Sequence, residues 1–204
     1  MPRAFTEAER EKIKGKLIHA GKSLINTAGL RHFSVDDAAR EARISKGSFY
    51  SFFSSREDFI LSVLESWEAE YRGALIRGIA EGGGTPRERI EKFFLGAFEI
   101  LDREPGLARL RTTEIQEVID RLPPQRIEAH QAADNRILKE TFGGWVSQGL
   151  VSRSLMEALR GLIPALFSIA IHRDDFPPGT YQPAVRLIAE ALGLRIASGA
   201  ERRG

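Results

Sequence analysis

The chain has 204 residues, of which 42% are hydrophobic, and a formal net charge of +2. This length can build a sizeable core, in one domain or in a small and a larger one. The chain has no cysteine, which excludes disulfides, thiol catalysis and thiolate metal sites. Its N-terminus is charged and no apolar run approaches the ~18 residues of a membrane span, so we expect a cytoplasmic protein that does not contact a membrane.

The charge is unevenly distributed along the chain. Residues 1–56 hold 11 Lys and Arg against 6 Asp and Glu, a net of +5. Residues 57–204 hold 19 against 22, a net of −3. A basic N-terminal part favours contact with a polyanion, although so small a surplus also fits an ordinary solvated surface.

The first expected helix begins after Thr6, which can form a capping box with Glu9, and ends at Gly29. Ile, Leu and Ala recur at helical spacing between these signals. We expect this helix to pack across the two short helices that follow.

Two N-cap residues then lie eleven positions apart. Ser34 begins a short alanine-rich helix, and Ser45 begins a segment over residues 46–52 that is too short to be stable alone. Two short helices joined by a tight turn form a helix-turn-helix, whose second helix can enter the DNA major groove. Lys46, Ser48 and Tyr50 carry the groups that contact phosphates and base edges.

Helical periodicity continues through the rest of the chain, and no strand pattern or internal repeat appears. Capping boxes are expected at Ser54–Glu57, Thr85–Glu88 and Ser154–Glu157. Gly82–Gly84 is best read as a connection between helices, since no Walker lysine follows it. Further helices are expected over residues 54–77, 85–104, 107–122, 124–148, 154–172, with a kink at Pro164, and 183–196. The fold class is therefore all-α, with about nine helices.

The stretch A-x-x-A-R-I-S-K-G-S-F-Y-x-F-F-S-S-R-E-D-F, residues 39–59, resembles the signature of the TetR family of bacterial transcriptional regulators. The motif is specific because many positions match in order. One position departs from it, because Arg43 stands in the turn where the family commonly has Gly. A residue other than Gly at positive φ costs roughly 1 kcal/mol, which a phosphate contact by Arg43 could offset.

The resemblance implies a helix-turn-helix DNA-binding domain over residues 1–55, with its motif at about 34–53, and a helical regulatory domain over 56–204. The DNA-contacting residues that it implies are Ser34, Arg43, Ser45, Lys46, Gly47, Ser48, Tyr50 and Arg56. Ser45 can both cap its helix and touch phosphate, whereas Lys46 has the alternative of being an ordinary solvated lysine. Gly47 allows either close approach of a backbone or packing of a neighbouring helix. Ser48 is the candidate for reading a base edge. Phe49 and Phe53 are expected in the core rather than as intercalating wedges.

The resemblance also implies homodimerisation through the last two helices, about 154–172 and 183–196, although their apolar residues could instead form a monomer core. A dimer would bind an inverted repeat with half-sites roughly 34–36 Å apart. A pocket for a hydrophobic or aromatic inducer is implied among the body helices. Its candidate lining residues, each of which could instead be core, are Trp67, Tyr71, Phe94, Phe98, Phe142 and Trp145.

Together these features predict a repressor that binds operator DNA and is released by a small molecule. The alternative is a helical ligand-binding or assembly module without specific DNA binding. Enzymatic activity is not expected, because no nucleophile elbow or dinucleotide fingerprint is present. His130 and Asp134 lie one helical turn apart but lack a third ligand nearby in the sequence, so we expect no metal site and no cofactor.

Overall fold

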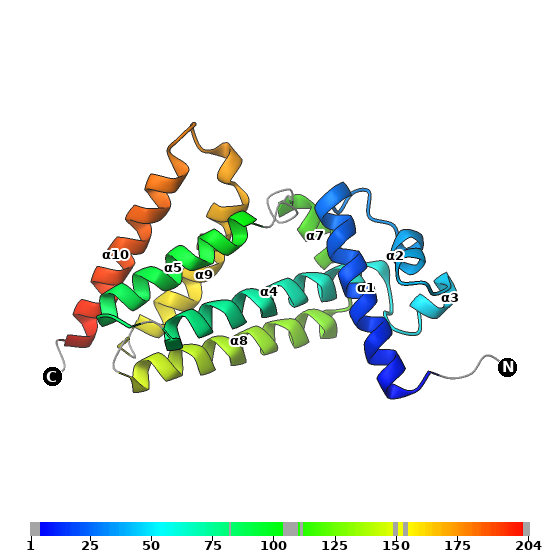
Figure 1. Cartoon of the computed structure of the whole chain (residues 1–204), viewed down its shortest axis with the longest axis horizontal. Helices are drawn as coiled ribbons and strands as arrows, with labels where there is room; N and C mark the ends of the chain where they lie inside the picture. The colour runs from blue at the N-terminus through cyan, green and yellow to red at the C-terminus, as the bar shows by residue number, and fades with distance from the viewer. Residues whose placement is uncertain are drawn as a thin grey trace. The chain divides into compact units, whose positions relative to one another are not determined.

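The computed structural model describes residues 5–81, 83–103, 110, 112–148, 151–152 and 155–201. Within these ranges the protein is helical and has no strand, which confirms the all-α prediction. None of the helices in these ranges is both long and apolar enough to cross a membrane. The α-helices, labelled in Figure 1, are α1 (Glu7–Ala28), α2 (Val35–Glu41), α3 (Lys46–Phe49), α4 (Arg56–Glu81), α5 (Pro86–Arg103), α7 (Thr112–Asp120), α8 (Pro124–Ser147), α9 (Met156–Ile171) and α10 (Tyr181–Glu201). The 3₁₀ helix η2 (Arg173–Asp175) lies between α9 and α10 in the sequence.

The chain divides into two compact units. The first comprises residues 1–69 and 105–127, and the second comprises residues 70–104 and 128–204. Helices α4 and α8 each begin in the first unit and end in the second. The first unit therefore holds the helix-turn-helix segment together with the start of α4 and with α7.

Local capping patterns were predicted well for several helices. Thr6 and Glu9 form the expected capping box, in which the Glu9 backbone N–H donates to Thr6 Oγ1 at 3.3 Å and the Thr6 N–H donates to Glu9 Oε2 at 2.8 Å. Gly29 follows α1 with φ of 74°, the left-handed region that glycine adopts without strain. Thr85 and Glu88 pair in the same reciprocal way at the start of α5.

Other helix boundaries differ from the prediction. At the start of α4 the cap is Ser55, whose Oγ accepts from the backbone N–H of Asp58 at 3.0 Å, and Asp58 accepts from Ser54. The box expected between Ser54 and Glu57 is therefore shifted by one residue. Helix α3 ends at Phe49, and α10 begins at Tyr181 rather than at residue 183. Ser154, residues 104–109 and residue 111 lie outside the described residues.

The second unit has its own hydrophobic core, in which α5 packs along α10 and against α9. At one end of α5, Asp102 joins this helix to the α9–α10 connection. Its carboxylate accepts from Arg173 at 3.3 Å, from the hydroxyl of Tyr181 at 3.1 Å and from Gln182 at 2.9 Å. The core residues are Ile90, Phe94, Phe98, Trp145, Val151, Leu166, Ala170, Val185, Ala189 and Ile196.

Candidate nucleic-acid interface

The predicted helix-turn-helix is present in the first unit. Ser34 Oγ caps α2 by accepting from the backbone N–H of Asp37 at 3.4 Å, and Ser45 Oγ caps α3 by accepting from that of Ser48 at 3.0 Å. The turn between the helices contains Arg43, whose φ of 60° is the only positive value at a non-glycine position in the described residues. The expectation that this turn requires positive φ is thus confirmed.

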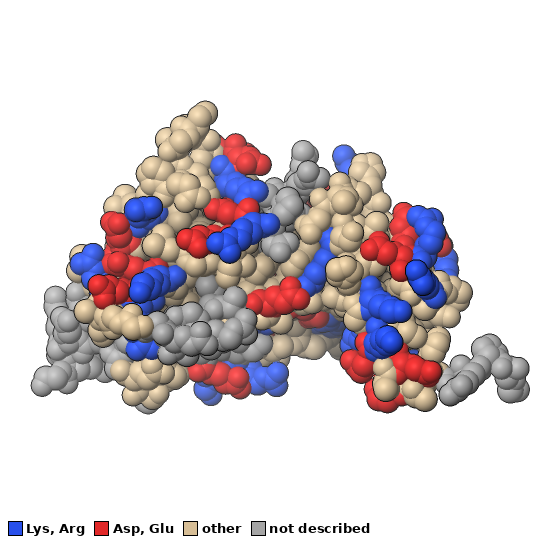
Figure 2. Space-filling model, in the orientation of Figure 1, with Lys and Arg blue, Asp and Glu red and all other residues tan. Residues whose placement is uncertain are grey.

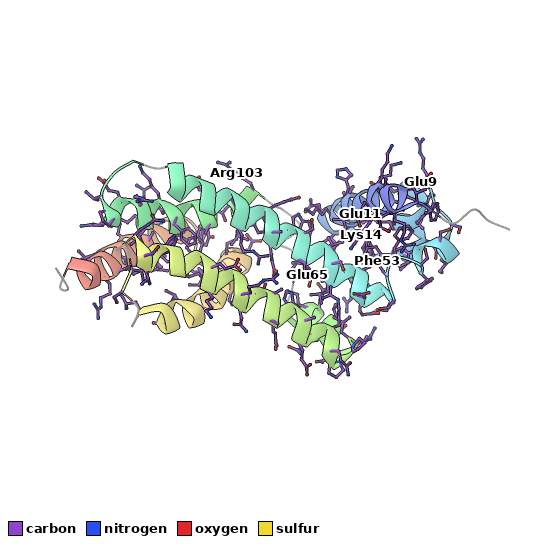
Figure 3. The ribbon with its side chains drawn as sticks, turned by 90° about the horizontal axis from the view of Figure 1, so that it is seen from below. Glu9, Glu11, Lys14, Phe53, Glu65 and Arg103 are labelled. Atoms are coloured by element: carbon purple, nitrogen blue, oxygen red, sulfur yellow. The ribbon has the colours of Figure 1, made fainter. Side chains whose placement is uncertain are left out.

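Beneath α3 lies a cluster of phenylalanine rings. Phe49 and Phe59 are fully buried and Phe53 is 3% exposed, so Phe49 and Phe53 are core residues and not wedges. The ring centroids of Phe49 and Phe53 both lie close to that of Phe59, at 5.1 Å and 4.7 Å. Phe53 is labelled in Figure 3. The cluster fixes the short α3, which could not persist without tertiary packing.

The residues of α3 that do not face this core lie on the surface. Ser45, Lys46 and Gly47 are exposed, Ser48 is half-buried, and Tyr50 is 49% exposed with its ring packed edge-on against Phe49. The hydroxyls of Ser45 and Ser48 are 2.8 Å apart and share a hydrogen bond. The structure thus brings five of the predicted DNA-contacting residues together on one short segment.

Gly47 has no structural reason to be glycine within the described residues. Its φ is not positive, and a Cβ built on it would meet only Ser45 Oγ, at 3.8 Å. Of the two roles expected for Gly47, packing of a neighbouring helix is therefore excluded for the described residues. The other expected role of Gly47, close approach of a backbone, stays a prediction.

Two arginines have roles that the sequence pattern did not predict. Arg56, expected to face a phosphate, donates to the backbone carbonyl oxygens of Leu30 at 2.7 Å and Phe33 at 3.3 Å, which fastens α4 to the α1–α2 connection. Arg10 of α1 donates to the Ser51 carbonyl at 2.8 Å and stacks over the ring of Phe52. A phosphate contact by Arg56 stays a prediction.

Charges of both signs surround this segment. Figure 2 shows basic and acidic side chains intermingled on the visible face of the molecule rather than one uniform basic surface. Arg43 lies in a shallow cavity of about 390 Å³ with Lys16 and His19 of α1. On the other side of the turn, Lys46 donates to Asp36 Oδ2 at 2.8 Å. The hydrogen bond and the charge of Asp36 raise the pKa of Lys46.

The residues predicted to line a ligand pocket are divided between the units. Trp67 is buried in the first unit, where Lys22 lies over its ring. Phe94, Phe98 and Trp145 belong to the core of the second unit and are 1–4% exposed. Tyr71 is half-buried, and the side chain of Phe142 lies outside the described residues. Their role in ligand binding stays a prediction.

A short, outward-facing helix held on an aromatic core behind an alanine-rich helix places the protein in the helix-turn-helix class of DNA-binding proteins. The comparisons with known proteins agree. Residues 17–63 match the family model described as bacterial regulatory proteins of the tetR family. Over these residues the chain is similar to the TetR family of bacterial transcriptional regulators.

The curated relatives that match are regulators and not enzymes. The transcriptional regulator AcuR of Cereibacter sphaeroides is 31% identical over 93 residues, which are 46% of this chain and 40% of AcuR. The HTH-type transcriptional repressor KstR2 of Mycobacterium tuberculosis is 23% identical over 136 residues, which are 67% of this chain and 68% of KstR2. The match to AcuR therefore spans less than half the length of that relative.

Solved structures resemble the whole fold at low sequence identity. A TetR-family regulator from Rhodococcus sp. superposes with a TM-score of 0.64 and 18% identity, covering 89% of this chain and 98% of that one. The fatty acid degradation regulator FadR from Bacillus halodurans gives a TM-score of 0.62 with 18% identity, covering 94% and 97%. At such identities the likeness concerns the fold alone.

Proposed function

We propose that the protein is a transcriptional repressor that binds an inverted-repeat operator as a homodimer and is released by a small apolar or aromatic inducer. The observation that carries the proposal is the exposed segment from Ser45 to Tyr50, which combines hydroxyl, ammonium and phenol groups on a rigid aromatic base. Such groups contact phosphates and base edges, and the rigid base holds them in one register.

Gly47 supports this assignment because its open backbone is not used inside the described protein. A phosphate group can approach the peptide N–H groups of a helix start only where no side chain stands in the way. Tyr50, which is exposed through half of its surface, is placed two residues beyond Ser48 and can donate its hydroxyl to a phosphate. In this proposal Tyr50 contacts a phosphate and positions the helix, while Ser48 contacts a base edge and reads the sequence.

The surface of α10 supports a dimer. Leu187 and Leu194 are 67% and 54% exposed, and they lie seven residues apart, so they share one face of the helix. Exposed large apolar side chains on one helix face are compatible with a surface that a second copy covers. A second copy placed there would give two α3 helices, as two half-sites one DNA turn apart require.

The second unit supplies an environment for an apolar inducer. Its core contains Phe94, Phe98 and Trp145, and the partly buried Phe93 packs against this core with its ring in edge-to-face contact with Trp145 at 4.7 Å. Ligand sites in proteins are lined mainly by apolar and aromatic side chains. If the inducer weakens operator binding, operator DNA must weaken inducer binding by the same factor.

The test is a footprint of the purified protein on genomic fragments, including the DNA next to its own gene, at about 0.15 M salt. Protection of a short inverted repeat is expected. The variant Gly47→Ala should weaken operator binding while the helical content stays unchanged, because its Cβ meets nothing closer than 3.8 Å inside the described protein. Gly15→Ala, with nothing within 4 Å of the new methyl group, is the matched control.

Diffuse protection at every salt concentration would contradict the proposal and favour an assembly module without specific DNA binding.

For the dimer, Leu187→Glu and Leu194→Glu are expected to shift the sedimentation coefficient to that of a monomer and to abolish the footprint. A monomeric wild-type protein that still protects both half-sites would contradict the assignment of α10.

A further inference from the structure

Lys46, at the start of α3, is held by a residue of the preceding helix. Its ammonium donates to Asp36 Oδ2 at 2.8 Å across ten residues of sequence, so the pair joins the first turn of α2 to the first turn of α3. The side chains of Lys46 and Asp36 are 55% and 60% exposed. The pair therefore lies on the surface beside Ser45 and Ser48.

Asp36 lies in the first turn of α2, where a carboxylate favours the helix, but neither this nor attraction to phosphate explains its pairing with Lys46. Exposed ion pairs contribute little to stability, because water screens the charges and two long side chains must be ordered. A carboxylate next to a phosphate is repelled by it, and pairing with Asp36 cancels most of the attraction that Lys46 would exert. A helix-turn-helix that only had to attract a polyanion would gain nothing from pairing Lys46 with Asp36.

The pair does match the edge of one base pair. Lys46 keeps two N–H donors after bonding Asp36, and guanine presents two acceptors, O6 and N7, in the major groove. The paired cytosine presents an N4 amino donor beside them, for which a carboxylate is the matching acceptor. Phosphate offers acceptors only, and cannot satisfy Asp36.

We infer that Asp36 and Lys46 act as one unit that reads a G·C base pair in each half-site, with Asp36 as a specificity-determining residue. The inference rests on the proposed operator binding and names the base chemistry of that same site. Lys46 donates to O6 and N7 of guanine, and Asp36 both orients Lys46 and accepts from N4 of cytosine.

The test measures the base preference of full-length protein at every position of an inverted repeat, by selection from a randomised half-site followed by competition titration. Asp36→Ala should reduce discrimination at one G·C position in each half-site by about tenfold and leave the other positions unchanged. Lys46→Ala should lose preference at the same position. Asp37→Ala is the matched control, because it removes the same charge from the same turn of α2 while its partner, Arg40, lies within that helix.

Three results would overturn the inference. The first is the same base preference in Asp36→Ala and Asp37→Ala. The second is tighter binding of Asp36→Ala to all sequences equally, which would make Asp36 only a source of phosphate repulsion. The third concerns the slope of the logarithm of the binding constant against the logarithm of the salt concentration. If Lys46→Ala reduces this slope by about 0.9 for each DNA-binding domain, Lys46 neutralises a phosphate instead. A wild-type protein that selects no sequence would remove the proposed function as well, and is thus distinguishable.

Discussion

The contact between α1 and α4 depends on the absence of a side chain at Gly21. A Cβ built there would lie 2.5 Å from Val63 Cγ2 and 2.9 Å from Phe59 Cζ. Both neighbours belong to α4 and are fully buried, so neither can move aside without disturbing the core. Phe59 also supports the rings beneath α3, which links this contact to the DNA-binding segment.

The perturbation is Gly21→Ala. Overpacking a well-packed core by a methyl group costs roughly 1–3 kcal/mol, whereas replacing Gly by Ala inside a helix gains about 0.5–1 kcal/mol. The net effect is a loss of about 1 kcal/mol of unfolding free energy. Gly15→Ala, in the same helix with nothing within 4 Å, receives only the gain and should be more stable than the wild type. The two variants should therefore differ by roughly 1–3 kcal/mol.

Urea unfolding followed by far-ultraviolet circular dichroism measures this difference as a shift in midpoint at unchanged slope. Fluorescence of Trp67, which lies in the first unit, gives a second probe, with Trp145 in the second unit as the internal reference. If Gly21→Ala were as stable as Gly15→Ala, α1 would not pack against Val63 and Phe59 as described.

Three further predictions concern charged residues of the first unit. Arg126→Met should lower the free energy of unfolding by about 2 kcal/mol, as measured by urea unfolding. This is less than the loss of a fully buried ion pair would cost, because Arg126 and its partners Asp58 and Glu65 are 17–31% exposed. Burial raises the pKa of Asp58, but hydrogen bonds from Arg126 and Ser54 outweigh this and hold the pKa below 3.8. The stability from Asp58 is thus present above that pH and lost as pH falls through its folded pKa, so Asp58→Asn should flatten the acid limb of a stability profile. Arg43→Gly relieves the positive φ and should raise the unfolding free energy by about 0.5 kcal/mol, after the larger chain entropy of Gly is subtracted.

Sequence predicted the features of this protein that depend on neighbours three or four residues apart. The caps at Thr6, Ser34, Ser45 and Thr85 are all of this kind. The cap of α4 was misplaced by one residue, because Ser55 and Asp58 have the same spacing as Ser54 and Glu57 and the pattern does not choose between them. The bond from Arg126 to Asp58 spans 68 positions, and a local pattern contains no trace of such a contact.

The same division applies to the candidate interface. The motif identified the residues of α3 and the strain at Arg43, since both are properties of a short segment. It did not point to the bond between Lys46 and Asp36, because Asp36 reads in the sequence as an ordinary acidic residue that favours a helix N-terminus. It did not point to the two backbone carbonyls, more than twenty residues earlier, to which Arg56 donates, and a phosphate contact by Arg56 stays a prediction.

Two arginines, one on α4 itself and one on α8, hold the start of α4. A change at either arginine can therefore reach the helix-turn-helix segment through α4. Arg56 binds the α1–α2 connection. Arg126, on the first turn of α8, binds Asp58. Arg126 also donates two hydrogen bonds of 2.7–2.8 Å to Glu65, which is labelled in Figure 3. Asp58 in turn accepts from Ser54, five residues after the end of α3. Because Arg126 lies on the first turn of α8, its removal takes away the bond that ties α8 to Asp58. Amide hydrogen exchange in Arg126→Met should therefore quicken more over residues 54–60 than in α1, and an equal change in both segments would contradict this local tie.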